Sequence, residues 1–296
     1  MILMRFPVFF LCIFFSLNGV FVYGDFQQDI LRADRLWARK KYSAAQKYYI
    51  RSLKTASNSA QRVRAKSGIL NCMFKCGEKD EILCSAVEDI VFREPALSAQ
   101  SLVRLFSFYA DKEPQEKKRL KMAEFALQRK NLSEYQRSLI FAGILQRMGT
   151  TRAGKYIKQI LSLPGAAPRA RGLALGYKAN NVMISRKDFK QADKLFSEAL
   201  ACPGLPPQER QFFLMRQAIA RLSAGDRTGA EKAFLLGLKE PSSVHLSAVY
   251  EELEKLYSSS GRTGAVAALV SRAAEDKRLT GRAREIYKAK AKKQIF

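Results

Sequence analysis

The sequence has a single histidine, His245, and lacks the short motifs of common catalytic and nucleotide-binding sites. Without a second histidine, most general-base and nucleophile arrangements have no group to orient the reacting side chain. No phosphate-binding loop, serine-nucleophile elbow or zinc-binding helix motif is present. The glycine-rich stretch from Gly261 to Gly264 has no preceding strand, so it is interpreted as a turn. We expect a packing or solvent-facing role for His245, and we predict no catalysis, no cofactor and no small-molecule substrate.

Cysteine is also scarce, with five residues in a chain of 296. Four of them follow the N-terminal segment: Cys72, Cys76, Cys84 and Cys202. An even number permits disulfide bonds in an oxidising compartment, where Cys84 could pair with Cys72 or Cys76. The alternative is that all four are small buried apolar side chains. No metal site is predicted, because the only histidine is distant and there is no second close cysteine pair.

Nine prolines and 17 glycines are too few for a collagen-like or low-complexity chain. Runs that alternate β-branched and polar residues, typical of half-buried strands, are rare beyond the N-terminus. Most of the chain is instead rich in Lys, Leu, Ala, Arg, Glu and Gln, which lose little on entering a helix. Hydrophobic residues make up 47% of the sequence, enough for a large core. The composition therefore predicts an all-α protein.

The longest uncharged segment lies at the N-terminus, where Arg5 precedes an apolar run that extends to residue 23. The compact residues that end at Gly24, followed by Asp25, predict a secretory signal peptide that is cleaved after Gly24. An uncleaved membrane anchor is the alternative, because the run is just long enough to span a bilayer. Both interpretations export the rest of the chain, since Arg5 favours the cytoplasmic side. We therefore expect a periplasmic or secreted protein, or one that residues 1–24 anchor to a membrane.

Acidic residues are few beside the basic ones: 27 Asp and Glu against 52 Lys and Arg, a net charge of +25. This excess favours anionic partners by long-range attraction, whatever the fold. Export argues against nucleic acid and favours acidic lipid, an anionic envelope polymer or an acidic protein. Two clusters are predicted to attract anions, and they contain Arg35, Arg39, Lys40 and Lys41, and Arg282, Arg284, Lys288 and Lys292. Further basic groups, each of which a scatter of solubilising charges would also explain, are Arg62, Arg64 and Lys66; Arg152, Lys155 and Lys158; and Arg169, Arg171, Lys178, Arg186, Lys187 and Lys190.

A pattern of alanine, a bulky apolar residue and leucine, each four residues apart, recurs four times. Residues four apart share one face of a helix, so each copy predicts an apolar stripe. The alanine has to be small where the partner helix approaches most closely, and a proline ends the helix in the three later copies. The four copies are Ala45, Tyr49 and Leu53; Ala153, Ile157 and Leu161; Ala192, Phe196 and Leu200; and Ala230, Phe234 and Leu238.

This signature, on helix pairs of about 34–38 residues, resembles the tetratricopeptide repeat. The resemblance implies a helical-hairpin solenoid, one continuous superhelix of about seven repeats over residues 25–276. A basic segment, residues 277–296, would follow as a capping helix or a frayed tail. Residues 59–130 keep the helical pattern but lose the signature. Helix pairs are expected to begin near Phe26, Ser59, Leu97, Leu132, Ala167, Pro206 and Pro241.

In this family the first helices of successive repeats line a concave groove, which receives an extended peptide or a partner's helix. The resemblance therefore implies a scaffold for protein–protein interactions in the cell envelope. Trp37 is either an aromatic anchor of the groove or a residue buried between repeats. The alternative function is a surface-tethering module that binds anionic lipid or envelope polymer and releases it as salt rises. The groove residues that the resemblance implies are Gln27, Ile30, Asp34, Trp37, Tyr177, Asn181 and Ile184.

Overall fold

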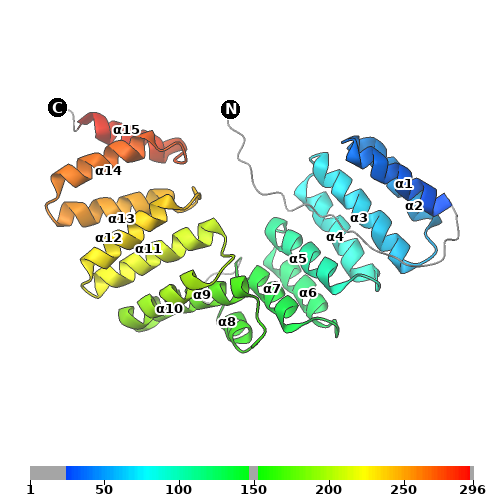
Figure 1. Ribbon diagram of the computed structural model, residues 1–296, viewed down its shortest axis with the longest axis horizontal. Coiled ribbons are helices and arrows are strands. Elements are labelled where there is room, and N and C mark those ends of the chain that lie inside the picture. Colours follow the sequence, from blue (N-terminus) through cyan, green and yellow to red (C-terminus); the bar gives the residue numbers. More distant parts are fainter. Residues whose placement is uncertain (1–24, 147–152, 294–296) are drawn as a thin grey trace. The chain divides into compact units, whose positions relative to one another are not determined.

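The computed structural model describes residues 25–146 and 153–293, and these residues form 15 α-helices and no β-strand (Figure 1). The predicted all-α fold is therefore confirmed. Contacts within the chain divide it into two compact units, Met1–Gly77 and Glu78–Phe296, and each is described by itself. The single continuous superhelix stays a prediction. The predicted signal segment, residues 1–24, lies outside the described residues.

The first unit contains three helices: α1 (Asp25–Ala38), α2 (Tyr42–Thr55) and α3 (Ser59–Lys75). Helix α2 packs against both α1 and α3. The core of this unit includes Phe26, Ile30 and Ala33 from α1, with Ala45 and Tyr49 from α2. The stripe predicted for α2 therefore faces α1, as a helix pair requires.

The second unit contains the other twelve described helices, which extend from cyan to red in Figure 1. Each helix packs against the next one in the chain. In addition, α5 packs on α7, α7 on α9 and α9 on α11, so the first helices of these pairs form one layer. The bounds are α4 (Asp80–Arg93), α5 (Ala99–Lys112), α6 (Glu116–Leu127), α7 (Glu134–Leu145), α8 (Gly154–Leu161), α9 (Pro168–Arg186), α10 (Phe189–Ala201), α11 (Pro207–Ser223), α12 (Arg227–Lys239), α13 (Leu246–Ser259), α14 (Thr263–Glu275) and α15 (Gly281–Lys293).

The recurring alanines and the bulky residues after them are buried in the helix pairs. All four alanines are completely buried, and the bulky residues that follow them at four positions are buried as well. Phe196 and Phe234 have no exposed surface. Burying a phenylalanine side chain contributes on the order of 2 kcal/mol, so these stripes account for a large share of each pair's stability. The predicted stripes are thus confirmed in Ala45, Ala153, Ala192 and Ala230 and the residues that follow them.

The α5–α6 pair lacks the signature and carries a larger side chain where the alanine would be. At the fourth residue of the second helix, α10 has Ala192, whereas α6 has Arg119. Arg119 is buried, and its Nη1 donates to the main-chain oxygens of Glu113 at 2.6 Å and Pro114 at 2.8 Å. Glu113 is buried too. This pair therefore buries two charged side chains, Glu113 and Arg119.

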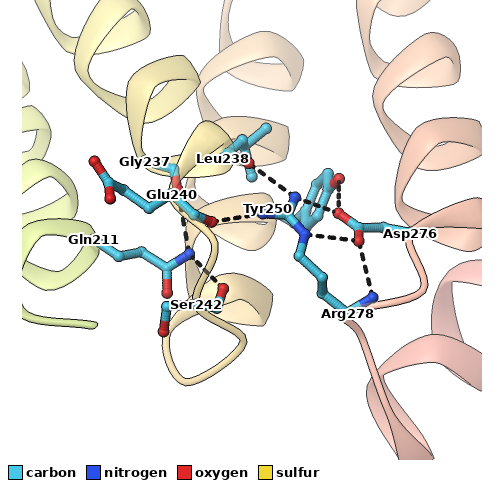
Figure 2. A network of polar contacts seen from close by, with 8 residues as sticks. All are labelled: Gln211, Gly237, Leu238, Glu240, Ser242, Tyr250, Asp276 and Arg278. Carbon is cyan, nitrogen blue, oxygen red and sulfur yellow. Dashed lines mark hydrogen bonds and ion pairs between the residues drawn. The ribbon is translucent and has the colours of Figure 1, made fainter. Parts of the chain in front are cut away.

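Three arginines join the end of one helix pair to the pair that follows. Arg137 and Arg210 donate from Nη1 to the main-chain oxygens of Leu127 and Leu200, both at 3.2 Å. Arg278 donates from Nη2 to the oxygen of Leu238 at 2.8 Å (Figure 2). The last carbonyls of a helix have no partner within the helix, and a guanidinium group supplies several donors at once. Part of the chain's positive charge is therefore structural.

The tight turns between paired helices use left-handed backbone conformations. Lys40 has φ 59° in the turn between α1 and α2, and Gly225 has φ 89° between α11 and α12. Gly261 has φ 65° between α13 and α14, so the glycine-rich stretch is the turn that its sequence predicts. Arg152, one of the basic residues named in the sequence analysis, lies outside the described residues. No helix of the described ranges has the length and apolar character that spanning a bilayer requires.

Gly176 permits an unusually close contact in the first-helix layer. A Cβ atom at this position would lie 2.3 Å from ring atoms of Phe213 in α11. Real Cβ atoms do not approach other atoms so closely, so α9 and α11 pack at a separation that requires glycine here. This contact brings α9 and α11 together beside the cleft described next.

Candidate functional site

A cleft of about 470 Å³ lies on the first-helix layer of the second unit. Its walls come from α5, α7 and the first turns of α9 and α11, which pack side by side. The volume falls within the range of ligand-binding pockets in proteins. We name it the layer cleft. Its lining includes Phe108, Asp111, Leu139, Gln146, Arg169 and Glu209.

A chain of polar contacts crosses the layer cleft. Arg169 donates from Nη2 to Oε1 of Gln146 at 3.5 Å, and Gln146 donates from Nε2 to Oε1 of Glu209 at 3.5 Å. The hydroxyl of Tyr177 donates to Oε2 of Glu209 at 3.3 Å. These distances are at the long end of hydrogen bonding, so a ligand that offers better geometry can compete for the same groups. Glu209 is buried, with 8% of its surface exposed.

Burial and charge shift the pKa values of Tyr177 and Arg169 without changing the protonation state of either group at neutral pH. Burial, together with the charge of Glu209, raises the pKa of Tyr177, which therefore remains a hydrogen-bond donor. Burial of the guanidinium group lowers the pKa of Arg169, while the charge of Glu209 acts in the opposite direction. Arginine stays protonated despite such a shift. The layer cleft thus presents a cation, an amide and a carboxylate beside the apolar Phe108 and Leu139.

The three groove residues predicted in the second unit do not share one cleft. Tyr177 lies under the layer cleft, where it is largely buried and positions Glu209. Asn181 lines a different cleft, between α8 and α9. Ile184 is 57% exposed. These residues follow at four- and three-residue steps on one face of α9, so their separation comes from their different places along the helix axis, about 10 Å from the first to the last.

In the first unit, two of the predicted groove residues have structural roles. Ile30 is completely buried, so its side chain cannot contact a partner in the folded unit, and that assignment is corrected here. Asp34 accepts hydrogen bonds from Tyr49 at 2.6 Å and from Arg64 at 2.7 Å.

The other two groove residues of the first unit, Gln27 and Trp37, are half-buried. Trp37 packs edge-on against Tyr42, with 6.0 Å between the ring centroids, and lies against the core. This position favours the packing role that the sequence left open for Trp37.

The anion-attracting residues predicted in the first unit lie together at one end of α1. Arg35, Arg39, Lys40 and Lys41 are all exposed and follow the last turn of α1 into the turn before α2. Cations at a helix C-terminus interact favourably with the helix dipole, so a structural contribution accompanies any binding role. Whether they bind an anion stays a prediction.

The basic residues predicted in the tail belong to a docked helix rather than a frayed end. Tyr287 of α15 is buried, with its ring centroid 5.7 Å from that of Tyr250, and Lys290 donates to Glu254 at 2.7 Å. Arg284, Lys288 and Lys292 follow at four-residue steps and share one side of α15, whereas Arg282 lies on another. Lys288 and Lys292 are exposed, and Arg284 is half-buried.

The four cysteines of the described ranges lie in different environments. Cys72, Cys76, Cys84 and Cys202 are all free. Burial raises the pKa of Cys72 to about 12 and that of Cys84 to about 11, so both stay protonated thiols at neutral pH. Cys76 is exposed and Cys202 is half-buried, so the alternative in which all four are buried is wrong at these two positions.

His245 has the packing role that was expected of it. Its ring packs 5.1 Å from that of Phe212, measured between the ring centroids. Burial lowers the pKa of His245, which favours the neutral form. No group of three or more potential metal ligands comes together in the described part of the chain.

Comparisons with known proteins bear on the fold. No protein-family model and no curated protein matches the chain. Among solved structures, it resembles a tetratricopeptide repeat protein from Parabacteroides merdae with a TM-score of 0.51 and 12% sequence identity, over 92% of this chain and 99% of that one. The TPR2AB domain of yeast Sti1 in complex with pHSP90 also matches, with a TM-score of 0.29 and 11% identity, over 90% and 92% of the two chains.

The first of these similarities confirms that the chain has the fold of tetratricopeptide repeat proteins. The successive helix pairs, the buried alanines and the shared layer of first helices are the features that carry it. At 12% identity the likeness concerns the fold and not a particular partner.

Proposed function

We propose that this protein is an exported, non-catalytic scaffold that holds a segment of a partner protein in the layer cleft. The observation that carries the proposal is the position of that cleft, on the layer of first helices, where the repeat fold offers a partner-binding surface. The cell-envelope setting rests on the signal-like segment at residues 1–24. A periplasmic or secreted location follows from it.

The lining of the layer cleft suits a chain segment with both apolar and polar groups. Phe108 and Leu139 supply apolar contact, which dominates affinity in protein interfaces. Gln146 offers a donor and an acceptor to a peptide main chain, while Arg169 and Glu209 offer both signs of charge. These groups come from four helices, so the folded second unit positions them before a partner arrives.

A charge placed in the layer cleft is expected to abolish this recognition. Leu139→Glu would put a carboxylate beside Asp111 and Glu209, and recovery of the partner should fall at least about tenfold, equivalent to about 1.4 kcal/mol of binding free energy. The measurement is a crosslinked pull-down of the tagged protein from its native envelope, quantified by mass spectrometry. Leu236→Glu is the matched control, because Leu236 is exposed on α12 outside the cleft.

One outcome of this pull-down would contradict the proposed binding site. If Leu139→Glu folds normally by circular dichroism and still recovers the partner as well as Leu236→Glu does, the layer cleft is not the binding site. Washes at about 0.15 M and about 0.6 M salt separate apolar recognition, which persists, from purely ionic attachment, which is lost.

A surface-tethering role is the second candidate function. The observation that favours it is the common side of α15 occupied by Arg284, Lys288 and Lys292, together with the exposed cluster from Arg35 to Lys41. Anionic lipid or envelope polymer bound there should be recovered in the same pull-down at the lower salt concentration only.

Processing of the N-terminus tests the export part of the proposal. N-terminal sequencing of the protein from its native host should begin at Asp25, because a signal peptidase would cut after Gly24. Recovery of Met1 in the membrane fraction would instead establish the uncleaved anchor. Recovery of Met1 in the cytoplasm would contradict export altogether.

A further inference from the structure

A second cleft in the same unit has an unbalanced charge. It has a volume of about 690 Å³ and is bordered by Lys158 of α8 and by Lys178 and Arg186 of α9, and none of the described residues that line it carries a carboxylate. All three side chains are exposed. Within the described ranges none of the three forms an ion pair. We name it the basic cleft; it shares no lining residue with the layer cleft.

The floor of the basic cleft is apolar. Ile157 of α8 and Val182 of α9 are nearly buried there, with 5% and 7% of their surfaces exposed, and Leu161 lies beside them. Ser162, Ser185 and Gln191 add neutral hydrogen-bonding groups. The cleft therefore combines an apolar floor with a cationic rim, a combination that suits a chain with alternating apolar and anionic groups.

From these features we infer that the basic cleft binds an extended acidic segment of a partner protein. Carboxylates of that segment pair with Lys158, Lys178 and Arg186, and its apolar side chains pack against Ile157 and Val182. The planar guanidinium of Arg186 can bind a carboxylate with two parallel hydrogen bonds. The inference stands apart from the proposed function, because the two clefts have separate linings.

Charge complementarity is the first argument for this occupant. Three like charges around one recess repel each other, and an anionic ligand that enters it removes that repulsion. Exposed Lys155, Lys187 and Lys190 lie nearby in sequence on the same or adjoining helices, and they extend the positive potential outward. Such a field raises the rate at which an anionic segment arrives.

Shape and lining separate an acidic polypeptide from other polyanions. A membrane surface is flat on this scale and cannot reach an apolar floor at the bottom of a recess. Single-stranded nucleic acid binds by stacking its bases on aromatic side chains, and the lining of the basic cleft contains none. A flexible polypeptide can enter the recess and use both the floor and the rim.

Fluorescence anisotropy with a short fluorescein-labelled peptide that alternates glutamate and leucine tests the inference on the full chain. The triple variant Lys158→Glu, Lys178→Glu, Arg186→Glu should weaken binding at least about tenfold, the loss of a few partly exposed ion pairs. A control triple changes the net charge equally at exposed lysines elsewhere in the unit and should weaken binding no more than about twofold. The control is Lys232→Glu, Lys239→Glu, Lys277→Glu.

Several outcomes would overturn the inference. Equal losses in the two triples would show that net charge alone attracts the peptide. Equal binding of a glutamine–leucine peptide would remove the role of the cationic rim. No saturable binding by the unmodified protein up to about 1 mM peptide would also overturn it, as would retention of phosphatidylglycerol vesicles but not of the peptide.

A mapping experiment keeps the test decisive if the charge-reversal triple does not fold. A photo-crosslinker at a leucine of the same peptide should label the unmodified protein in α8 or in the last half of α9, near Ile157 and Val182. Labels confined to α15, or to the turn after α1, would place the acidic segment elsewhere and overturn the inference.

Discussion

Phe213→Ala is expected to lower the free energy of unfolding of the second unit by about 3–5 kcal/mol, the usual cost of removing a fully buried aromatic ring. Phe213 has no exposed surface. Its ring meets Tyr177 edge-on with 5.7 Å between centroids and lies 6.1 Å from the ring of Phe196. It also fills the space that Gly176 leaves open. No neighbouring helix can close such a cavity without losing these contacts, so relaxation recovers little of the loss.

Denaturant unfolding followed by far-ultraviolet circular dichroism measures this effect. Tyr135→Ala removes a ring of similar size from an exposed position, 53% accessible, and should change stability by no more than about 0.5 kcal/mol. Trp37 is the only tryptophan and lies in the first unit, so its fluorescence records that unit separately. A loss below about 1 kcal/mol for Phe213→Ala would mean that α9, α10 and α11 do not share a tightly packed core.

Arg278→Met is expected to lower the free energy of unfolding by about 2–3 kcal/mol, because charged hydrogen bonds are lost and their acceptors stay half-buried. Arg278 donates to the main-chain oxygens of Leu238 at 2.8 Å and Glu240 at 2.6 Å (Figure 2). It also contacts Asp276 at 2.7 Å. The Arg278 side chain remains 26% exposed, and water therefore compensates part of the loss. Methionine keeps most of the aliphatic volume, so the change isolates the guanidinium group.

The pH dependence of the difference in unfolding free energy between wild type and Arg278→Met distinguishes the ion pair with Asp276 from the hydrogen bonds to the carbonyls. Burial by itself would raise the pKa of Asp276, but hydrogen bonds from Arg278 and Tyr250 hold it below its ordinary value of 3.8. The ion pair therefore stabilises the fold above that value and is lost as pH falls through the lower pKa of the folded state. The stability difference between wild type and Arg278→Met should narrow below about pH 4.

Arg272→Met is the control for this series, because Arg272 is exposed on α14. It should change stability by about 0.5 kcal/mol or less at every pH. The contrary outcome is a difference in unfolding free energy between wild type and Arg278→Met that stays constant down to about pH 2. That result would show that the hydrogen bonds to the main-chain carbonyls, and not the ion pair with Asp276, stabilise this region.

The periodic signature located the best-defined helix pairs because it is a local property. An alanine, a bulky residue and a leucine at four-residue steps share a helical face in any context, and Ala192 and Ala230 are buried as that face requires. The expected starts at Ser59 and Ala167 agree closely with the observed starts of α3 and α9.

The helix start expected near Pro241 lies before the observed start of α13 at Leu246. The chain between these two positions is held in a non-helical conformation by tertiary contacts. Gln211 donates to the oxygen of Ser242 at 3.1 Å (Figure 2). It also accepts a hydrogen bond from the main-chain nitrogen of His245 at 3.0 Å. These contacts satisfy main-chain groups that a helix would otherwise use.

The sequence by itself therefore determined the all-α class, the repeating helix pairs and the apolar stripe of each well-marked second helix. Only the tertiary structure decided which side chains face a cleft. Leu139 and Glu209 belong to the layer cleft although neither falls on the signature, because the first helices pack on both sides and their apolar pattern does not reveal the open face. The charges show the same division: Arg278 ties two helix pairs together, whereas Lys158 borders an open cleft. The residue types are alike, and the difference lies in the neighbours that folding brings to each.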